Sequence, residues 1–249
     1  MAATPRLSAH FYEQKCTQHL YRARLSLRLA QDHIASKSTH LSDYKEDVDK
    51  CRDSPSQHLK PELASLAVKT HFLLLKVNFE FFLNRVIYWA CDLHFAHLVN
   101  EKGFRKLLTD FKKTLAIQDF VTEIAQNSGK EYVLDKVVPP QGLNRFELIL
   151  ESGFGISMAD VVGENDHGQI CFAFEVRHLI EHRNGKVDAQ FKEKVGRYWT
   201  KSSWRDASLN KGDEIEIRQV DFDATFAAML HGVHTIAESV GRYEPKGPH

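Results

Sequence analysis

The sequence lacks an excess of charge of either sign. Its 33 lysine and arginine residues equal its 33 aspartate and glutamate residues, so the formal net charge at pH 7 is zero before histidine is counted. A neutral chain is not expected to coat nucleic acid with a broadly basic surface, although a local basic patch is compatible with this balance. Apolar residues make up 43% of the 249 residues, which is enough for a globular protein with a sizeable core.

Cysteine is scarce, and the motifs of several large enzyme classes are missing. The four cysteines lie far apart, at Cys16, Cys51, Cys91 and Cys171, and none forms a Cys-x-x-Cys pair. This spacing gives no sign of a zinc ribbon or a dithiol redox motif. The sequence also contains no glycine-rich phosphate loop, no nucleophile elbow and no paired-carboxylate motif.

Long uninterrupted apolar runs are absent too. The first ten residues contain no apolar core of the length found in a signal peptide. The most apolar region, 66–99, is interrupted by Lys69, Lys76, Glu80, Arg85 and Asp92. Charges at this frequency are incompatible with a membrane span. We therefore expect a reduced, cytoplasmic protein that does not insert into a membrane.

The pattern that is present is helical. Apolar residues recur at steps of three and four over most of the chain, which predicts an all-α fold built as a helical bundle. The expected helices cover about 7–36, 41–51, 62–99, 103–114, 117–127, 144–151, 167–183 and 222–240. Residues 214–218 after Gly212 predict a minor β strand or hairpin. No internal repeat or polar linker divides the chain, so we expect a single domain over 1–249.

The helix expected over 62–99 is apolar nearly all round, which is typical of the central element of a bundle. The last helix carries one apolar stripe, and either Asp221 or Asp223 can cap it. We expect this stripe to pack on the central helix. The residues expected at this contact are Phe226, Leu230 and Val233 on the last helix, and Leu74, Phe82 and Ile87 on the central helix.

The residues best suited to chemistry stand near the end of the helix expected over 167–183. Arg177 is a permanent cation whose planar fork fits phosphate oxygens. His182 can accept and release a proton near neutral pH. Asn184 and Gly185 follow and are expected to end the helix. A cation for phosphate and a proton-transfer group for a hydroxyl are what metal-free RNA cleavage requires.

The run from Arg177 to His182 resembles the Arg-polar-x-x-x-His signature of the HEPN superfamily, and the Arg-Asn-Gly-x-Val-Asp tail at 183–188 is similar to that family as well. The order of the expected elements resembles larger bacterial HEPN-like proteins. The resemblance implies a helical bundle that acts as a metal-independent endoribonuclease and leaves a 2′,3′-cyclic phosphate. It also implies a role as a toxin or antiviral defence component, with an antitoxin or another defence protein as a possible partner.

Arg177 and His182 do not share a face of a straight helix. Five residues correspond to about 500°, which leaves the two side chains roughly 140° apart. A loosened last turn, a curled arginine side chain or a second subunit could bring them together. The resemblance favours the second subunit, because these proteins place two motifs face to face. We therefore expect a homodimer.

Two further residues belong to the predicted site. His178 fills the polar position of the motif and could hydrogen-bond the phosphate or orient His182. Its spacing of four from His182 also suits a two-histidine metal site, but no third ligand is evident, and we expect neither metal nor cofactor. Glu80 is the best upstream acid, and it could pair either with Arg177, as the resemblance suggests, or with Lys76 one turn away.

These observations favour a metal-independent endoribonuclease with Arg177, His182, His178 and Glu80 as its site residues and RNA as its substrate. The alternative is a non-catalytic dimer of the same fold that binds RNA, a nucleotide or a protein partner. A purely structural helical adaptor is a third, weaker interpretation.

Overall fold

A computed structural model describes residues 8–36, 59–98, 142–183, 185–196, 198, 204 and 209–244. Seven helices lie within these ranges, and they confirm the predicted all-α fold. The helices expected near 41–51, 103–114 and 117–127 lie outside the described residues.

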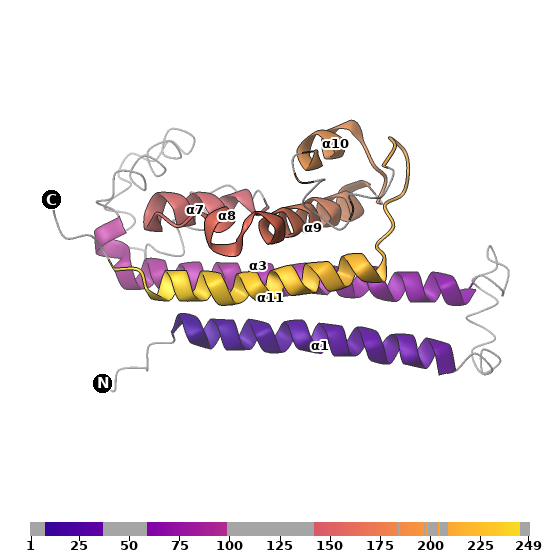
Figure 1. Cartoon of the computed structure of the whole chain (residues 1–249), viewed down its shortest axis with the longest axis horizontal. Coiled ribbons are helices and arrows are strands. Elements are labelled where there is room, and N and C mark those ends of the chain that lie inside the picture. Colours follow the sequence, from indigo (N-terminus) through magenta and orange to yellow (C-terminus); the bar gives the residue numbers. More distant parts are fainter. Residues whose placement is uncertain are drawn as a thin grey trace.

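Three long helices form one half of the structure. They are α1 (Ala9–Ser36), α3 (Leu59–Leu98) and α11 (Gln219–Gly241). Each of the three contacts the other two, and they run side by side in Figure 1. On α1 the recurring apolar residues Cys16, Leu20, Ala23 and Leu27 are buried, so the spacing of three and four correctly indicated a helix with one inner face.

Shorter helices form a second layer on the side of α3 and α11 away from α1 (Figure 1). They are α7 (Asn144–Phe154), α8 (Met158–Val162) and α9 (Glu164–Arg183), with α10 (Ala189–Val195) packed against α9. The sequence analysis missed α8 and α10. Both are too short for an apolar period to emerge, yet each has a side-chain cap: Ser157 accepts from the Asp160 N–H, and Asp188 accepts from the Phe191 N–H.

The contact between α11 and α3 differs in detail from the expected one. Phe226 and Val233 are buried on α11, whereas Leu230 is only partly buried. On α3 the expected Phe82 and Ile87 are buried, but Leu74 is 43% exposed and lies outside the contact. The all-round apolar composition of α3 could not reveal which of its faces stays open.

α3 is therefore the central helix of the bundle, but part of its surface remains exposed to solvent. Its exposed apolar side chains within the described residues are Leu63, Leu66, Leu74, Val77, Phe81 and Leu93. Even so, charged residues recur along its length, and no helix in the described ranges combines the length and apolar character needed to cross a bilayer.

At Gly232, α11 packs closely against both α3 and α9. A Cβ atom at this position would lie 3.2 Å from Ile170 Cδ1 on α9 and 3.4 Å from the Phe79 ring on α3. The absence of a side chain thus lets three helices meet at one point. Gln169 reinforces the same junction, because its amide donates to the Thr225 hydroxyl of α11 at 2.8 Å in a buried setting.

The strand or hairpin expected at 214–218 is reduced to one antiparallel bridge between Lys186 and Glu214, with no strand among the described residues. Backbone bonds between Val187 and Asp213 and between Ile215 and Gly185, each 2.8 Å, surround this bridge. The stretch between the end of α9 and the start of α10 is too short to pair with a full strand. The prediction of regular β structure was therefore wrong here.

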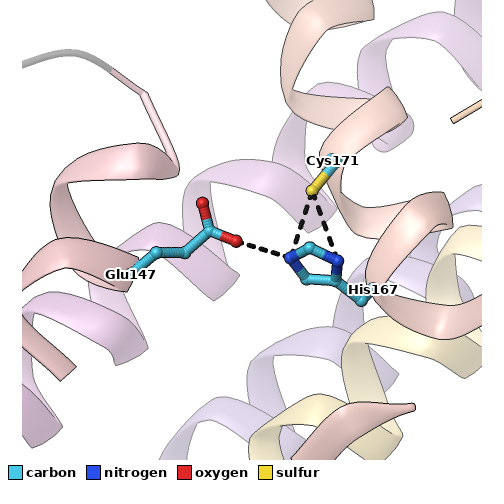
Figure 2. A group of neighbouring side chains, drawn as sticks. All are labelled: Glu147, His167 and Cys171. Carbon is cyan, nitrogen blue, oxygen red and sulfur yellow. Dashed lines mark hydrogen bonds and ion pairs between the residues drawn. The ribbon is translucent and has the colours of Figure 1, made fainter. Parts of the chain in front are cut away.

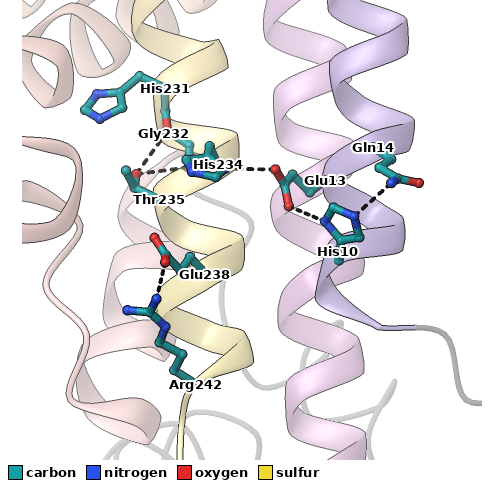
Figure 3. Close-up of polar contacts among 9 residues, drawn as sticks. All are labelled: His10, Glu13, Gln14, His231, Gly232, His234, Thr235, Glu238 and Arg242. Atoms are coloured by element: carbon teal, nitrogen blue, oxygen red, sulfur yellow. Dashed lines mark hydrogen bonds and ion pairs between the residues drawn. The ribbon is translucent and has the colours of Figure 1, made fainter.

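Polar contacts join α1 to α11 on the outside of the bundle (Figure 3). The Glu13 carboxylate accepts from Nδ1 of His234 at 2.9 Å and from Nδ1 of His10 at 2.9 Å. Burial alone would raise the pKa of Glu13, but the hydrogen bonds from the two histidines leave it below its ordinary value. The hydrogen bond to Glu13 raises the pKa of His234.

The Glu13–His234 contact makes stability depend on pH. The raised pKa of His234 adds stability that is fully present below its unfolded value of 6.5 and is lost as the pH rises through the folded value. The lowered pKa of Glu13 adds stability above 4.5 that is lost in stronger acid. We therefore expect His234→Gln to lower the melting temperature more at about pH 5.5 than at about pH 8. An equal loss at both values would contradict the contact.

The burial of side chains on α11 leads to a second prediction. Ile236 is fully buried, so Ile236→Ala should lower the free energy of unfolding by about 2–5 kcal/mol. Leu230→Ala should cost less, because Leu230 is only partly buried. Urea unfolding of the two variants beside the wild type measures the difference, and a larger loss for Leu230→Ala would show that the orientation of α11 is wrong.

Candidate functional site

The middle of α9 is enclosed by other helices. Every residue from 168 to 174 is buried, because α9 contacts α3, α8, α10 and α11. Polar side chains that reach solvent are therefore found toward the two ends of the helix. The C-terminal end carries the motif residues, and the N-terminal end carries His167.

Arg177 is held by Glu181, one turn further along the helix. The Arg177 Nε and Glu181 Oε1 atoms lie 2.5 Å apart, with the two side chains 31% and 36% exposed. The Nε group has no well-directed hydrogen bond among the described residues, so the contact is an ion pair. The guanidinium is thus partly open to solvent but already faces a carboxylate.

His178 and His182 form a second pair on the same end of the helix. Their ring centroids are 4.5 Å apart with an interplanar angle of 54°, and both residues are exposed. Partial burial lowers the pKa of His178, and the nearby His182 and Lys194 lower it further. A neutral His178 ring beside His182 can accept or donate one hydrogen bond at neutral pH.

The structure leaves Arg177 and His182 with different partners. Arg177 contacts Glu181, and His182 contacts His178, while the described residues show no contact between Arg177 and His182 themselves. This agrees with the angular separation derived for a straight helix. One copy of the chain therefore does not bring the side chains of Arg177 and His182 together.

Glu80 pairs with Lys76 rather than with Arg177. The pair is not an ordinary surface pair, because the Lys76 side chain is only 1% exposed and its ammonium lies 4.8 Å from the centre of the Phe174 ring. Burial lowers the pKa of Lys76, while Glu80 opposes this shift. Arg177 and Glu181 also act electrostatically on Lys76, so Lys76 links Glu80 to the motif arginine.

The end of α9 follows the predicted glycine. Gly185 has φ of 76°, and its N–H donates to the Leu179 carbonyl at 3.1 Å. A left-handed glycine after the last turn closes the helix without strain. Asn184 lies outside the described residues. The closed end keeps His182 in the last turn of α9.

The structure also brings together a group that sequence reasoning missed (Figure 2). Glu147 of α7 contacts His167 of α9, with Oε1 2.5 Å from Nε2. The Cys171 sulfur lies 3.4 Å from the same ring nitrogen. The spacing of four between His167 and Cys171 is visible in the sequence, but nothing there indicates that Glu147 joins them.

Two variants test whether Glu80 stabilises the buried ammonium group of Lys76. Glu80→Gln should lower the free energy of unfolding by roughly 1–3 kcal/mol, because it leaves the ammonium without its direct partner. Lys76→Met should cost less, since methionine fills the space without a charge. Thermal and urea unfolding give both values. If Lys76→Met proves the more harmful change, the ammonium is stabilised by groups other than Glu80.

Comparisons with known protein families, with curated proteins and with solved structures found no match to this chain. The resemblance to the HEPN superfamily accordingly rests on Arg177 to His182 and the residues that follow them.

Proposed function

We propose that the chain is a metal-independent endoribonuclease whose active site includes the C-terminal end of α9. The observation that carries the proposal is the exposed His178–His182 pair, with ring centroids 4.5 Å apart, directly beside Arg177. Two imidazoles provide proton transfer, and the guanidinium provides a phosphate ligand. These are the groups that cleavage through the ribose 2′-hydroxyl needs.

In this mechanism His182 accepts the proton of a 2′-hydroxyl, and the resulting oxygen attacks the adjacent phosphorus. The bond to the 5′-oxygen breaks, and that oxygen leaves as a hydroxyl after taking up a proton from solvent. Arg177 stabilises the negative charge on the phosphoryl oxygens. The products carry a 2′,3′-cyclic phosphate and a 5′-hydroxyl. His178, with its lowered pKa, remains neutral and hydrogen-bonds either the phosphate or His182.

Arg177 has to exchange Glu181 for the phosphate during binding. The exchange is physically accessible, because the ion pair is partly exposed and therefore weak in water. A phosphate also offers the guanidinium two acceptors in its plane. Glu181→Gln is consequently expected to strengthen RNA binding.

A second copy of the chain completes the site in this proposal. Arg177 and His182 have separate partners within one chain, and their helix positions diverge by roughly 140°. A symmetric dimer with the two motif ends face to face places Arg177 of one copy opposite His182 of the other. The homodimer is thus part of the mechanism.

The same geometry leaves a second candidate function, which is RNA or nucleotide binding without cleavage. The Glu181 carboxylate that neutralises Arg177 is the observation that favours it. An antitoxin or another defence protein could be the partner in either case. Wild-type protein that binds RNA but leaves it intact would select this second function.

The nuclease proposal predicts that purified protein cleaves RNA in the presence of EDTA. His182→Ala should abolish cleavage without affecting folding, because the side chain is exposed. Arg177→Lys should be strongly impaired, since lysine lacks the bidentate fork. His19→Ala, an equally exposed histidine on α1, serves as the matched control and should cleave normally. Undiminished cleavage by His182→Ala would remove this residue from the mechanism.

The shared site can be tested by mixing variants. An equal mixture of Arg177→Ala and His182→Ala chains forms mixed dimers in half of the cases, and each mixed dimer keeps one intact site. Cleavage should therefore return to about a quarter of the wild-type rate once subunits have exchanged. Absence of recovery, or a monomer in sedimentation at high micromolar concentration, would contradict the shared site.

A further inference from the structure

Three side chains of different chemical types converge near the N-terminal end of α9. The donor atoms of Glu147, His167 and Cys171 all lie within 4.8 Å of one another. The Glu147 oxygen and the Cys171 sulfur approach the same ring nitrogen, Nε2 of His167, at 2.5 Å and 3.4 Å. Figure 2 shows the carboxylate reaching the ring from α7 and the sulfur reaching it from the next turn of α9.

The distances suit one tetrahedral ion of the zinc class. When a thiolate and an imidazole bind the same zinc ion, their donor atoms stand about 3.5 Å apart. The observed sulfur–nitrogen distance of 3.4 Å already has this value. The Glu147 oxygen has to withdraw from the ring nitrogen by somewhat less than an ångström, which a partly exposed carboxylate on a flexible stem can do.

The donor types point to the same class of ion. Thiolate and imidazole select zinc-like transition metals over magnesium or calcium, which prefer oxygen ligands alone. The two other buried cysteines of the described residues belong to no such group of donors. Burial raises the pKa of both Cys16 and Cys91 to about 12, which makes these thiols poor ligands.

A cavity of about 390 Å³ opens beside the cluster. Glu147 and His167 line it together with Glu151, Ser157 and Tyr198. A structural zinc site is closed by four protein ligands, whereas a catalytic site has three and an open position. Here two of the three ligands, Glu147 and His167, line a cavity with room for water or a small molecule.

We propose that Glu147, His167 and Cys171 bind one divalent ion of the zinc class, whose fourth coordination position opens into this cavity. Binding displaces the thiol proton of Cys171 and leaves His167 neutral, so affinity rises with pH. The site is separate from the RNA-cleavage site, because about 15 Å of helix lies between His167 and Arg177. The proposed RNA cleavage is therefore tested independently of this metal site.

The test uses cobalt(II) as a coloured substitute for zinc, added to the reduced, metal-free, full-length chain. One equivalent should give the intense visible bands of a tetrahedral ion and a near-ultraviolet band from sulfur bonded to cobalt. Cys171→Ser should lose the sulfur band. Glu147→Gln should weaken binding by about tenfold or more, since loss of an outer partner alone already costs that much.

Two controls locate the ion. Cys16→Ala should keep the sulfur band, because Cys16 lies on α1 and is not one of the three donors. The double variant His178→Gln and His182→Gln should also keep it, which separates this site from the histidine pair at the other end of α9. A sulfur band that survives Cys171→Ser, or a wild-type chain that shows no such band, would overturn the proposal.

If the Cys171→Ser variant folds poorly, thermal melting of the wild type and of Glu147→Gln still tests the proposal. Zinc should raise the melting temperature of the wild type by a few degrees and that of Glu147→Gln by less at the same concentration. Because Glu147 is only partly buried, its conservative replacement should fold normally. Equal zinc shifts for both chains would contradict the proposal. RNA cleavage by zinc-loaded and metal-free wild type, compared below both melting temperatures, should be the same.

Discussion

The packing of α9 against its neighbours is the constraint on which both candidate sites depend. Its residues 168–174 are buried by the surrounding helices, and Gly232 lets α11 come within van der Waals distance of Ile170 and Phe79. Hydrophobic burial on this scale fixes the axis and rotation of α9 far more firmly than any single polar contact. Once the rotation is fixed, His167 and Cys171 face α7, and the motif side chains emerge from the other end.

Charge at the motif end is arranged as a chain of opposite signs rather than as a basic patch. Glu80 contacts the buried Lys76. Arg177 and Glu181 act electrostatically on Lys76, and Arg177 in turn contacts Glu181. A buried ammonium needs such compensation, because an unpaired charge in a low-dielectric interior is costly. The same arrangement leaves Arg177 paired but partly exposed in a chain of zero net charge.

Sequence reasoning worked where a long apolar period or a strong terminator was present. The ranges of α1 and α11 followed from apolar periodicity, that of α3 followed from its nearly all-round apolar composition, and Gly185 indicated where α9 ends. It failed where a feature depends on contacts between residues that are far apart in the sequence. No local pattern could show that Lys76 is buried against Phe174 or that Glu147 reaches His167. The expected strand at 214–218 had suitable residues, but its partner stretch before α10 was too short to pair with it.

The two ends of α9 carry different chemical groups, and we propose proton transfer at the C-terminal end. The ends of the RNA products test this claim most directly. Mass spectrometry of a defined RNA, cleaved by the wild type in the presence of a chelator, should find a 2′,3′-cyclic phosphate on one fragment and a 5′-hydroxyl on the other. Such ends arise only when the 2′-oxygen attacks the phosphorus. Fragments with a 3′-hydroxyl and a 5′-phosphate would contradict a mechanism in which His182 activates the 2′-hydroxyl.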